Sequence, residues 1–378
     1  MSLSNEDNLR LNVLLAGEVK AIRINESSMT VHALTPRGEA KVKLNANCRD
    51  EQYLRQVREL ISAVILGSPE GYPVYISRWI RMGQARDESL EQLLKLGEPE
   101  AVIAVVHAPG LTPELAKRAW WAAQETDNAR QMLQKSNIIN SELGKELAQH
   151  ILEFLPFEEE PMMQAESVQR ILQPGLLNTA EIQDLWHRGQ HKNSYLLGFL
   201  RSDMRLLPEQ QAAHDAYTSL AAKLKPLTEQ NNPVALLVLK ILSPEGQSFI
   251  QLCERVLKKP INQDIVNHFI VYLAQYFTSL KPDNMDNQAI ESLLPNVAQA
   301  CCMENPGMVT GLNAVLKQAP ELQAYLQAMM TLAALDYGVL RPIFSRTSSI
   351  GSLMRKKLKP VTSPIFEQLK QLRQPINI

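Results

Sequence analysis

The sequence has little that would tie the chain to an oxidising compartment, a membrane or a strongly charged partner. Its four cysteines show no CxxC spacing, and two of them, Cys301 and Cys302, are adjacent. Adjacent thiols seldom bridge each other, so neither a disulfide framework nor a zinc site is expected. No apolar run approaches the ~18 residues that a membrane-spanning helix needs. The net charge of −1 gives no whole-molecule attraction to nucleic acid or membrane.

Common catalytic and targeting motifs are also missing from the sequence. It contains no GxGxxG, GxxxxGK[ST] or GxSxG, which are the loops that hold dinucleotides, phosphates or a nucleophilic serine. The first residues, Met1–Asp7, are polar and acidic and lack the basic and apolar regions of a secretory signal. We therefore expect a cytoplasmic protein without a cofactor, and a binding scaffold more than an enzyme.

What is present is a long series of helical patterns from Asp50 to about Leu340. In Asp50–Gly67, apolar residues recur at three- and four-residue spacing, which is the stripe of an amphipathic helix. Proline in the first helical turn recurs at four further starts: Pro99, Pro113, Pro233 and Pro306. The patterns predict helices near 72–82, 88–96, 99–107, 113–134, 141–155, 163–172, 180–200, 208–224, 233–242, 245–258, 262–279, 287–302, 306–318 and 320–338.

The first 45 residues follow a different pattern. Ala40, Val42 and Leu44 alternate with charged residues, and 29–33 repeats the alternation before the turn Thr35–Gly38. A period of two residues is typical of a half-buried strand. Ile22 and Ile24 can supply a third strand. We predict a small antiparallel meander that packs on the helices, because so few strands are marginal alone.

These patterns predict a mainly α protein, an irregular α-solenoid-like stack of helices with a small N-terminal antiparallel β meander. We expect the meander over 1–48, a helical N-terminal region over 49–205, a helical C-terminal region over 206–340 and a basic segment over 341–378. The linker candidates are Phe154–Pro161 and the break at 206–208.

Two tryptophan-containing clusters are candidates for binding a protein partner. Arg78, Trp79, Arg81 and Arg86 combine an aromatic ring with guanidinium groups, a mixture that is enriched at interfaces; a core Trp79 flanked by solvated arginines is the alternative. Trp120 and Trp121 are neighbours, and neighbours on a helix point ~100° apart. Either this helix is packed on two sides, or one indole, for which Trp121 is the candidate, faces a groove or a partner.

Asp184, His187 and His191 have the spacing of one helix face. The outer two are ~10 Å apart along the axis, too far to share one ion with bonds near 2 Å. His187 and His191 remain a weak metal candidate as an i, i+4 pair, but the first histidine lacks the adjacent glutamate of HExxH. A polar helix face is the alternative. A catalytic Cys253 or Cys302 would need a nearby histidine.

The C-terminal segment is strongly basic. From Arg341 onward there are eight Lys/Arg residues and one acid, Glu367. A loop around 345–351 and a last helix over Ile365–Leu372 are expected. The cluster Arg355, Lys356, Lys357 and Lys359 can bind an acidic protein, a phosphate backbone or anionic lipid, or can fold back onto the acidic body of the chain.

Several blocks resemble a known family. They are Asp50–Leu60, Gly67–Tyr75, Gly97–Val102, Pro109–Thr112 and Lys117–Ala122. Together they resemble the bacterial sulfur reduction protein family DsrS, whose members accompany dissimilatory sulfite reductase in sulfur-oxidising bacteria. The resemblance covers about 8–135, and Pro174-Gly175-Leu176 fits it as well. It implies an accessory or regulatory protein of sulfur metabolism, with no assigned reaction and no catalytic residues to transfer.

The sequence thus favours a non-enzymatic cytoplasmic helical scaffold or regulatory accessory protein that binds a protein partner, linked to dissimilatory sulfur metabolism. No small-molecule substrate is evident. One alternative is an enzyme with a pocket between helices that uses His187, His191 or a cysteine. A second is nucleic-acid binding through the basic C-terminal segment.

Overall fold

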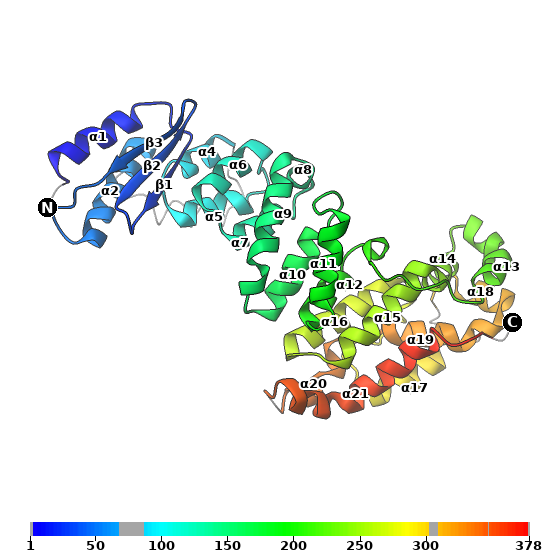
Figure 1. Cartoon of the computed structure of the whole chain (residues 1–378). Helices are drawn as coiled ribbons and strands as arrows, with labels where there is room; N and C mark the ends of the chain where they lie inside the picture. The colour runs from blue at the N-terminus through cyan, green and yellow to red at the C-terminus, as the bar shows by residue number, and fades with distance from the viewer. Residues whose placement is uncertain (1–2, 68–86, 302–308, 347, 377–378) are drawn as a thin grey trace. The chain divides into compact units, whose positions relative to one another are not determined.

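The structure, a computed structural model, describes residues 3–67, 87–301, 309–346 and 348–376. It is mainly α-helical with one small antiparallel sheet, as the sequence predicts (Figure 1). Contacts divide the chain into two compact units, Met1–Pro156 and Phe157–Ile378. This division falls inside the linker candidate Phe154–Pro161, and the boundary expected at 205/206 lies within the second unit.

The first unit begins with a helix and a three-stranded meander. Its elements are α1 (Asn5–Leu15), β1 (Ala21–Asn25), β2 (Thr30–Thr35), β3 (Gly38–Lys43), α2 (Asp50–Leu66), α4 (Asp87–Leu94), α5 (Pro99–His107), α6 (Pro113–Ala122), α7 (Thr126–Met132), α8 (Ser136–Ile139) and α9 (Glu142–Phe154). The strand order is β1-β2-β3, with Ile24 opposite Val31 and Val31 opposite Val42. The predicted meander and its three strands are confirmed.

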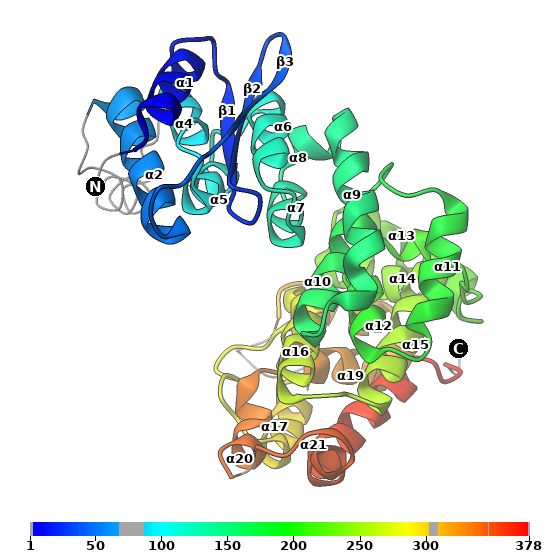
Figure 2. The same cartoon turned by 60° about the vertical axis from the view of Figure 1, so that its left-hand side comes forward.

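One face of the sheet is apolar and packs on α1 and α2. Ile22, Val31 and Val42 share a core with Leu11 of α1 and Val57 of α2. Figure 2 shows α1 and α2 on one side of the sheet and α6 on the other. The opposite face carries the charged residues of the alternation, so the period of two separates a core side from a polar side.

Helix α1 was not expected within the N-terminal region. Ser4 caps it by accepting a hydrogen bond from the backbone N–H of Asp7. Leu11 and Leu15 are buried, but Leu9 and Val13 on the other side are 67% and 68% exposed. The apolar residues therefore form no single stripe, and the periodicity that marks α2 is weak here.

The second unit is entirely helical within its described residues. Its α-helices are α10 (Pro161–Ile171), α11 (Thr179–Gly189), α12 (Asn193–Leu200), α13 (Tyr217–Glu229), α14 (Pro233–Leu242), α15 (Pro244–Lys258), α16 (Gln263–Tyr276), α17 (Ile290–Ala300), α18 (Leu312–Gln318), α19 (Gln323–Ala333), α20 (Arg341–Phe344) and α21 (Gly351–Gln371). Short 3₁₀ turns lie at Met204–Leu206, Thr278–Leu280, Pro320–Leu322 and Tyr337–Val339, and another, Leu155–Phe157, includes the last residues of the first unit. Consecutive helices pack on each other, as α13 does on α14 and α14 on α15.

Several predicted helices have different bounds in the structure. The helix predicted over 208–224 is α13, which begins only at Tyr217 and ends at Glu229. The predicted helix 113–134 is two helices, α6 and α7, because the backbone is extended at Ala123 and Glu125. The predicted helix 180–200 breaks between Gly189 and Asn193. The last helix starts near the expected loop, at Gly351, and continues through Pro360 and Pro364. The helices expected at 72–82 and at the start of 306–318 lie outside the described residues.

Every helix within the described residues is too short or too polar to cross a lipid bilayer.

Candidate functional site

The basic C-terminal segment forms an ordered helix with two different sides. The inner side of α21 buries five apolar residues at three- and four-residue spacing: Met354, Leu358, Val361, Ile365 and Leu369. This side packs on α15 and α19, and both views show α21 lying along α19 (Figures 1 and 2). Each proline inside the helix removes a backbone hydrogen bond, and burial of the apolar stripe compensates for that loss.

The C-terminal end of α21 is fixed by hydrogen bonds and an ion pair with two other helices, α15 and α19, and with the loop before α13. The Leu372 carbonyl accepts from Gln247 Nε2 at 3.2 Å and from the Tyr325 hydroxyl at 3.4 Å. Arg373 pairs with Glu254 of α15 at 2.9 Å. His214 Nε2 lies 2.8 Å from the Gln374 carbonyl. The second unit therefore holds the basic helix in one position, and the helix presents its outer side in a fixed geometry.

The four basic candidates on α21 differ in their surroundings. Arg355 donates to the Pro260 carbonyl at 3.3 Å, and Lys357 donates to Ser349 Oγ at 3.1 Å. Lys356 and Lys359 are exposed and make no hydrogen bond or ion pair with the described part of the chain. The first pair holds the start of the helix in place. The second pair is available to a partner.

The outer side of α21 combines these lysines with apolar surface. Lys356, Lys359 and Lys370 lie on one side of the helix together with Leu353, which is 54% exposed. Ile350, just before the helix, is 71% exposed. Glu367, the one acid of the segment, is exposed on the same side. We call Leu353, Lys356, Lys359 and Lys370 the basic face of α21.

Trp120 and Trp121 have different environments. Trp120 is 3% exposed, and its indole N–H donates to Glu146 Oε1 at 2.8 Å. Trp121 is half-buried, and the Arg23 guanidinium carbon lies 4.8 Å from its ring centroid. Arg23 Nη1 also lies 3.5 Å from the Trp121 carbonyl. The helix is thus packed on two sides, with an arginine from the sheet covering the second indole.

Arg23 is held by the carboxylate of Glu39 on the polar side of the sheet. It pairs with Glu39 at 3.4 Å, and Glu39 Oε1 lies 2.5 Å from His32 Nδ1. The hydrogen bond from His32, followed by the charges of Arg23 and Lys41, lowers the pKa of Glu39 against the effect of burial. Trp121 therefore stacks on an arginine whose position is set by this network.

A pocket of about 330 Å³ lies beside β1. Its walls come from Ile22, Arg23 and Ile24 of β1, Arg58 of α2, the turn Gly97–Pro99, and Ala122–Glu125 after α6. Side chains from both faces of β1 line this pocket, so it lies against the edge of the sheet. We call it the Glu98 pocket.

Glu98 is the most perturbed carboxylate in the described residues. Its side chain is only 12% exposed, and burial raises its pKa to about 7, against the opposing effect of Arg58. Arg58 Nε lies 2.8 Å from Glu98 Oε1, but the N–H is not aligned with that oxygen, and Nε has no hydrogen-bond partner in the described part of the chain. Arg58 also donates a hydrogen bond to Glu26. The attraction of Arg58 is too small to offset the lost hydration of Glu98.

Gly97 allows the turn before Glu98 to approach β1. Its φ of +69° lies in the left-handed region, and a Cβ added there would be 2.9 Å from Ile22 Cγ2. Both facts favour glycine at this position. The same turn brings Glu98 next to Arg58, which comes from a helix 40 residues earlier in the chain. Sequence reasoning treated Glu98-Pro99 only as a helix start and missed this pair.

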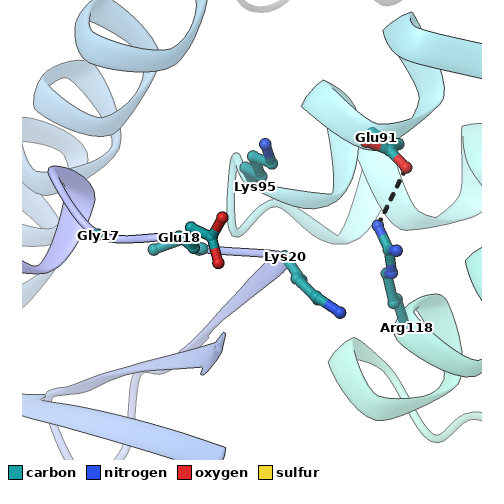
Figure 3. Close-up of a pocket in the computed structure, with 7 residues that line it drawn as sticks. Gly17, Glu18, Lys20, Glu91, Lys95 and Arg118 are labelled. Carbon is teal, nitrogen blue, oxygen red and sulfur yellow. Dashed lines mark hydrogen bonds and ion pairs between the residues drawn. The ribbon is translucent and has the colours of Figure 1, made fainter. Parts of the chain in front are cut away.

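A second pocket of about 260 Å³ holds charges of both signs. Figure 3 shows Lys20 extending toward Arg118, with Glu18 on the other side of Lys20. Arg118 pairs with Glu91 and with Glu114, each at 3.2 Å. Three cations and two carboxylates line the pocket, and Glu114 pairs with Arg118 from outside it, so little net charge is left to select a ligand. The sequence gives no signal for it, because its residues come from three separate elements.

The remaining candidates do not form a catalytic or metal-binding group. Helix α11 ends at Gly189, so His187 and His191, the weak metal candidate, do not lie on one helix as an i, i+4 pair. Asp184 pairs instead with Arg188 at 2.5 Å. Within the described residues, no group of three or more His, Cys, Asp or Glu side chains is placed to hold a metal ion. Cys253 is completely buried, and burial raises the pKa of its thiol.

Arg78, Trp79, Arg81, Arg86 and Cys302 lie outside the described residues. Comparisons of the chain with models of known families, with curated proteins and with solved structures find no match. The function is therefore inferred from the side chains and their arrangement.

Proposed function

We propose that this protein is a non-enzymatic helical scaffold that binds an acidic protein partner through the basic face of α21. The observation that carries the proposal is the fixed, two-sided arrangement of that helix. Its inner side is locked into the second unit, and its outer side presents Lys356, Lys359 and Lys370 beside Leu353. An ordered surface of this kind loses little conformational entropy when a partner binds.

The composition of the face favours a protein partner over nucleic acid. Leu353 and Ile350 supply apolar contact area next to the lysines, and protein interfaces combine an apolar centre with a polar rim. Phosphate backbones need cations but no exposed leucine. Glu367 on the same side would repel phosphates, whereas it can pair with a basic residue of a protein.

The test compares a charge-reversal variant with a matched control. Lys356→Glu/Lys359→Glu reverses two charges on the basic face. Lys225→Glu/Lys317→Glu reverses two exposed lysines of the same unit, on α13 and α18. Proteins that the wild type and the control capture, but the first variant does not, are purified. The Kd of each purified protein is then measured for the wild type, the first variant and the control. We expect the first variant to weaken Kd by about tenfold or more.

Two outcomes would contradict the proposal. Equal binding by the wild type and Lys356→Glu/Lys359→Glu would remove the basic face from the interface. A second contrary result is selective binding to duplex or single-stranded DNA that weakens steeply between 50 and 200 mM salt. That result would make nucleic acid the partner of this face.

We further propose a cytoplasmic accessory role in dissimilatory sulfur metabolism. Support comes from the resemblance of the blocks within residues 8–135 to the DsrS family, several of which lie in α2, α5 and α6. Deletion of the gene is expected to slow sulfur-dependent growth and to leave growth on other substrates unchanged. Equal growth of both strains on reduced sulfur compounds would overturn this assignment. Cell fractionation tests the cytoplasmic location.

A further inference from the structure

The Glu98 pocket has an apolar wall and an acidic end. Ile22, Ile24 and Val102 provide aliphatic surface, and Ala122 and Ala123 leave space because their side chains are small. The carboxylates that line the pocket are Glu26, Glu98 and Glu125. A volume of about 330 Å³ is at the lower end of the range for small-ligand sites.

The charges around the pocket leave it negative. Arg58 is shared between Glu26 and Glu98. Arg23 pairs with Glu39 outside the pocket and covers Trp121. Glu125 has no ion-pair partner in the described part of the chain. Two arginines and three carboxylates line the pocket, and one of the arginines, Arg23, is paired with Glu39 outside it, so the pocket has an excess of negative charge.

We propose that the Glu98 pocket binds a primary alkylammonium group, with the aliphatic chain along Ile22, Ile24 and Val102 and the ammonium between Glu98 and Glu26. An ammonium group has three N–H donors and is compact enough to share the carboxylates with Arg58. The ligand comes either from a lysine side chain of a protein or from a free aliphatic amine. This site lies in the first unit and is independent of the function proposed for α21.

The surroundings of Glu98 explain why such a ligand would bind. The Glu98 carboxylate has lost most of its water, and the hydrogen bond from Arg58 Nε is not formed. A second cation would restore the lost electrostatic stabilisation of the carboxylate. Below pH 7 the carboxyl group must lose its proton to receive the ammonium, because its pKa is raised to about 7. Binding is therefore expected to release a proton at pH 6 but not at pH 8.

Other titratable groups face the same region. Glu100 on α5 and Glu26 raise the pKa of Glu98 by repulsion, and Arg58 lowers it. Glu125 lines the pocket after α6. His32 reaches it only indirectly, through Glu39 and Arg23. If ligand binding releases one proton from the wild type and none from Glu98→Gln, the released proton comes from Glu98.

The experiment titrates the full chain with n-butylammonium chloride by calorimetry at pH 6 and pH 8. The ionised fraction of a group with a pKa of about 7 rises about tenfold over this interval. We expect Kd to be about tenfold weaker at pH 6. Glu98→Gln should reduce binding at pH 8 by about tenfold or more and abolish its dependence on pH. Glu51→Gln, an exposed change of equal charge on α2 of the same unit, is the matched control.

Two further arms identify the source of the ligand. 1,4-Diaminobutane represents free amines, and a short peptide with one lysine represents a protein partner; the same peptide with the lysine acetylated is its control. Neutral n-butanol should not compete with n-butylammonium for the Glu98 pocket. Absence of n-butylammonium binding, or equal Kd values at both pH values in the wild type, would overturn the proposal even if Glu98→Gln failed to fold. Equal affinity of a folded Glu98→Gln would do so as well.

Discussion

The hydroxyl of Tyr53 donates a 2.5 Å hydrogen bond to Asp7 Oδ2. The same oxygen accepts from the backbone N–H of Asn45 at 2.7 Å, and Asp7 is fully buried. One carboxylate thus joins α1, α2 and the loop after β3. Burial, followed by the bond to Asp7, raises the pKa of Tyr53 and keeps its hydroxyl protonated as a donor. The other carboxylate oxygen, Oδ1, has no partner in the described residues, so Asp7 depends on the bonds made by Oδ2.

Tyr53→Phe is therefore expected to destabilise the first unit. The change removes a donor to a buried carboxylate that has few others, and we expect a loss of about 1–3 kcal/mol in the free energy of unfolding. Urea denaturation followed by circular dichroism measures it. Tyr337→Phe, at a position that is 47% exposed, should change stability by less than about 0.5 kcal/mol. Equal effects of the two changes would show that the Asp7 bond contributes little.

Glu98 should make stability depend on pH near neutrality. Its carboxyl pKa is raised from 4.5 to about 7 in the folded chain, so the folded state holds the proton more tightly than the unfolded state. The free energy of unfolding should therefore fall as the pH rises from about 4.5 to about 7, and the penalty should persist above pH 7. Because Glu98 keeps some exposure through the pocket, we expect about 1–3 kcal/mol in total.

The measurement compares unfolding of the wild type, Glu98→Gln and Glu100→Gln at pH 5 and pH 8. Glu98→Gln should match the wild type at pH 5 and be more stable at pH 8. The difference between the free energies of unfolding of Glu98→Gln and the wild type at each pH cancels the contribution of all other titrating groups. Stabilisation of the same size by Glu100→Gln would assign the effect to the general charge of the region.

The parts of the fold that sequence reasoning predicts are those governed by local pattern. The meander follows from strict alternation in β3 and from the turn at Thr35–Gly38. Helix α2 follows from its apolar stripe and from Gly67, whose φ of +71° closes it. These signals lie within a few residues of each other, so a single sequence is sufficient to identify them.

The parts that it misses depend on contacts distant in sequence. Pro360 and Pro364 argue against a continuous helix, yet α21 forms because α15 and α19 cover its apolar side. Arg58 and Glu98 meet because α2 and the turn at Gly97 pack beside β1, and nothing in either local sequence indicates the partner. The lysine cluster on α21 was identified from composition, but its division into anchoring and exposed residues required the structure.

Gly198 of α12 is expected to be essential for the packing of the second unit. A Cβ added there would lie 2.5 Å from Val168 Cβ and 2.6 Å from the Ala165 carbonyl of α10. Both helices would have to separate, and Gly198→Ala should cost about 1–3 kcal/mol or more. Gly17→Ala, where the nearest atom is 3.3 Å away, is the control with a small expected effect. A neutral Gly198→Ala would show that α10 and α12 can move apart easily.

The stacking of Arg23 on Trp121 can be measured by a double-mutant cycle. The guanidinium lies 4.8 Å from the ring centroid at a partly exposed site, where such pairs contribute about 0.5–1 kcal/mol. Arg23→Met keeps an aliphatic chain over the ring, and Trp121→Leu removes the ring. The coupling energy is the difference between the double variant and the sum of the single variants. We expect about 0.5–1 kcal/mol at low salt, and a smaller value would indicate that Glu39 alone determines the position of Arg23. The fluorescence emission of Trp121 should shift to longer wavelength in Arg23→Ala, because the ring face that Arg23 covers in the wild type becomes accessible to water.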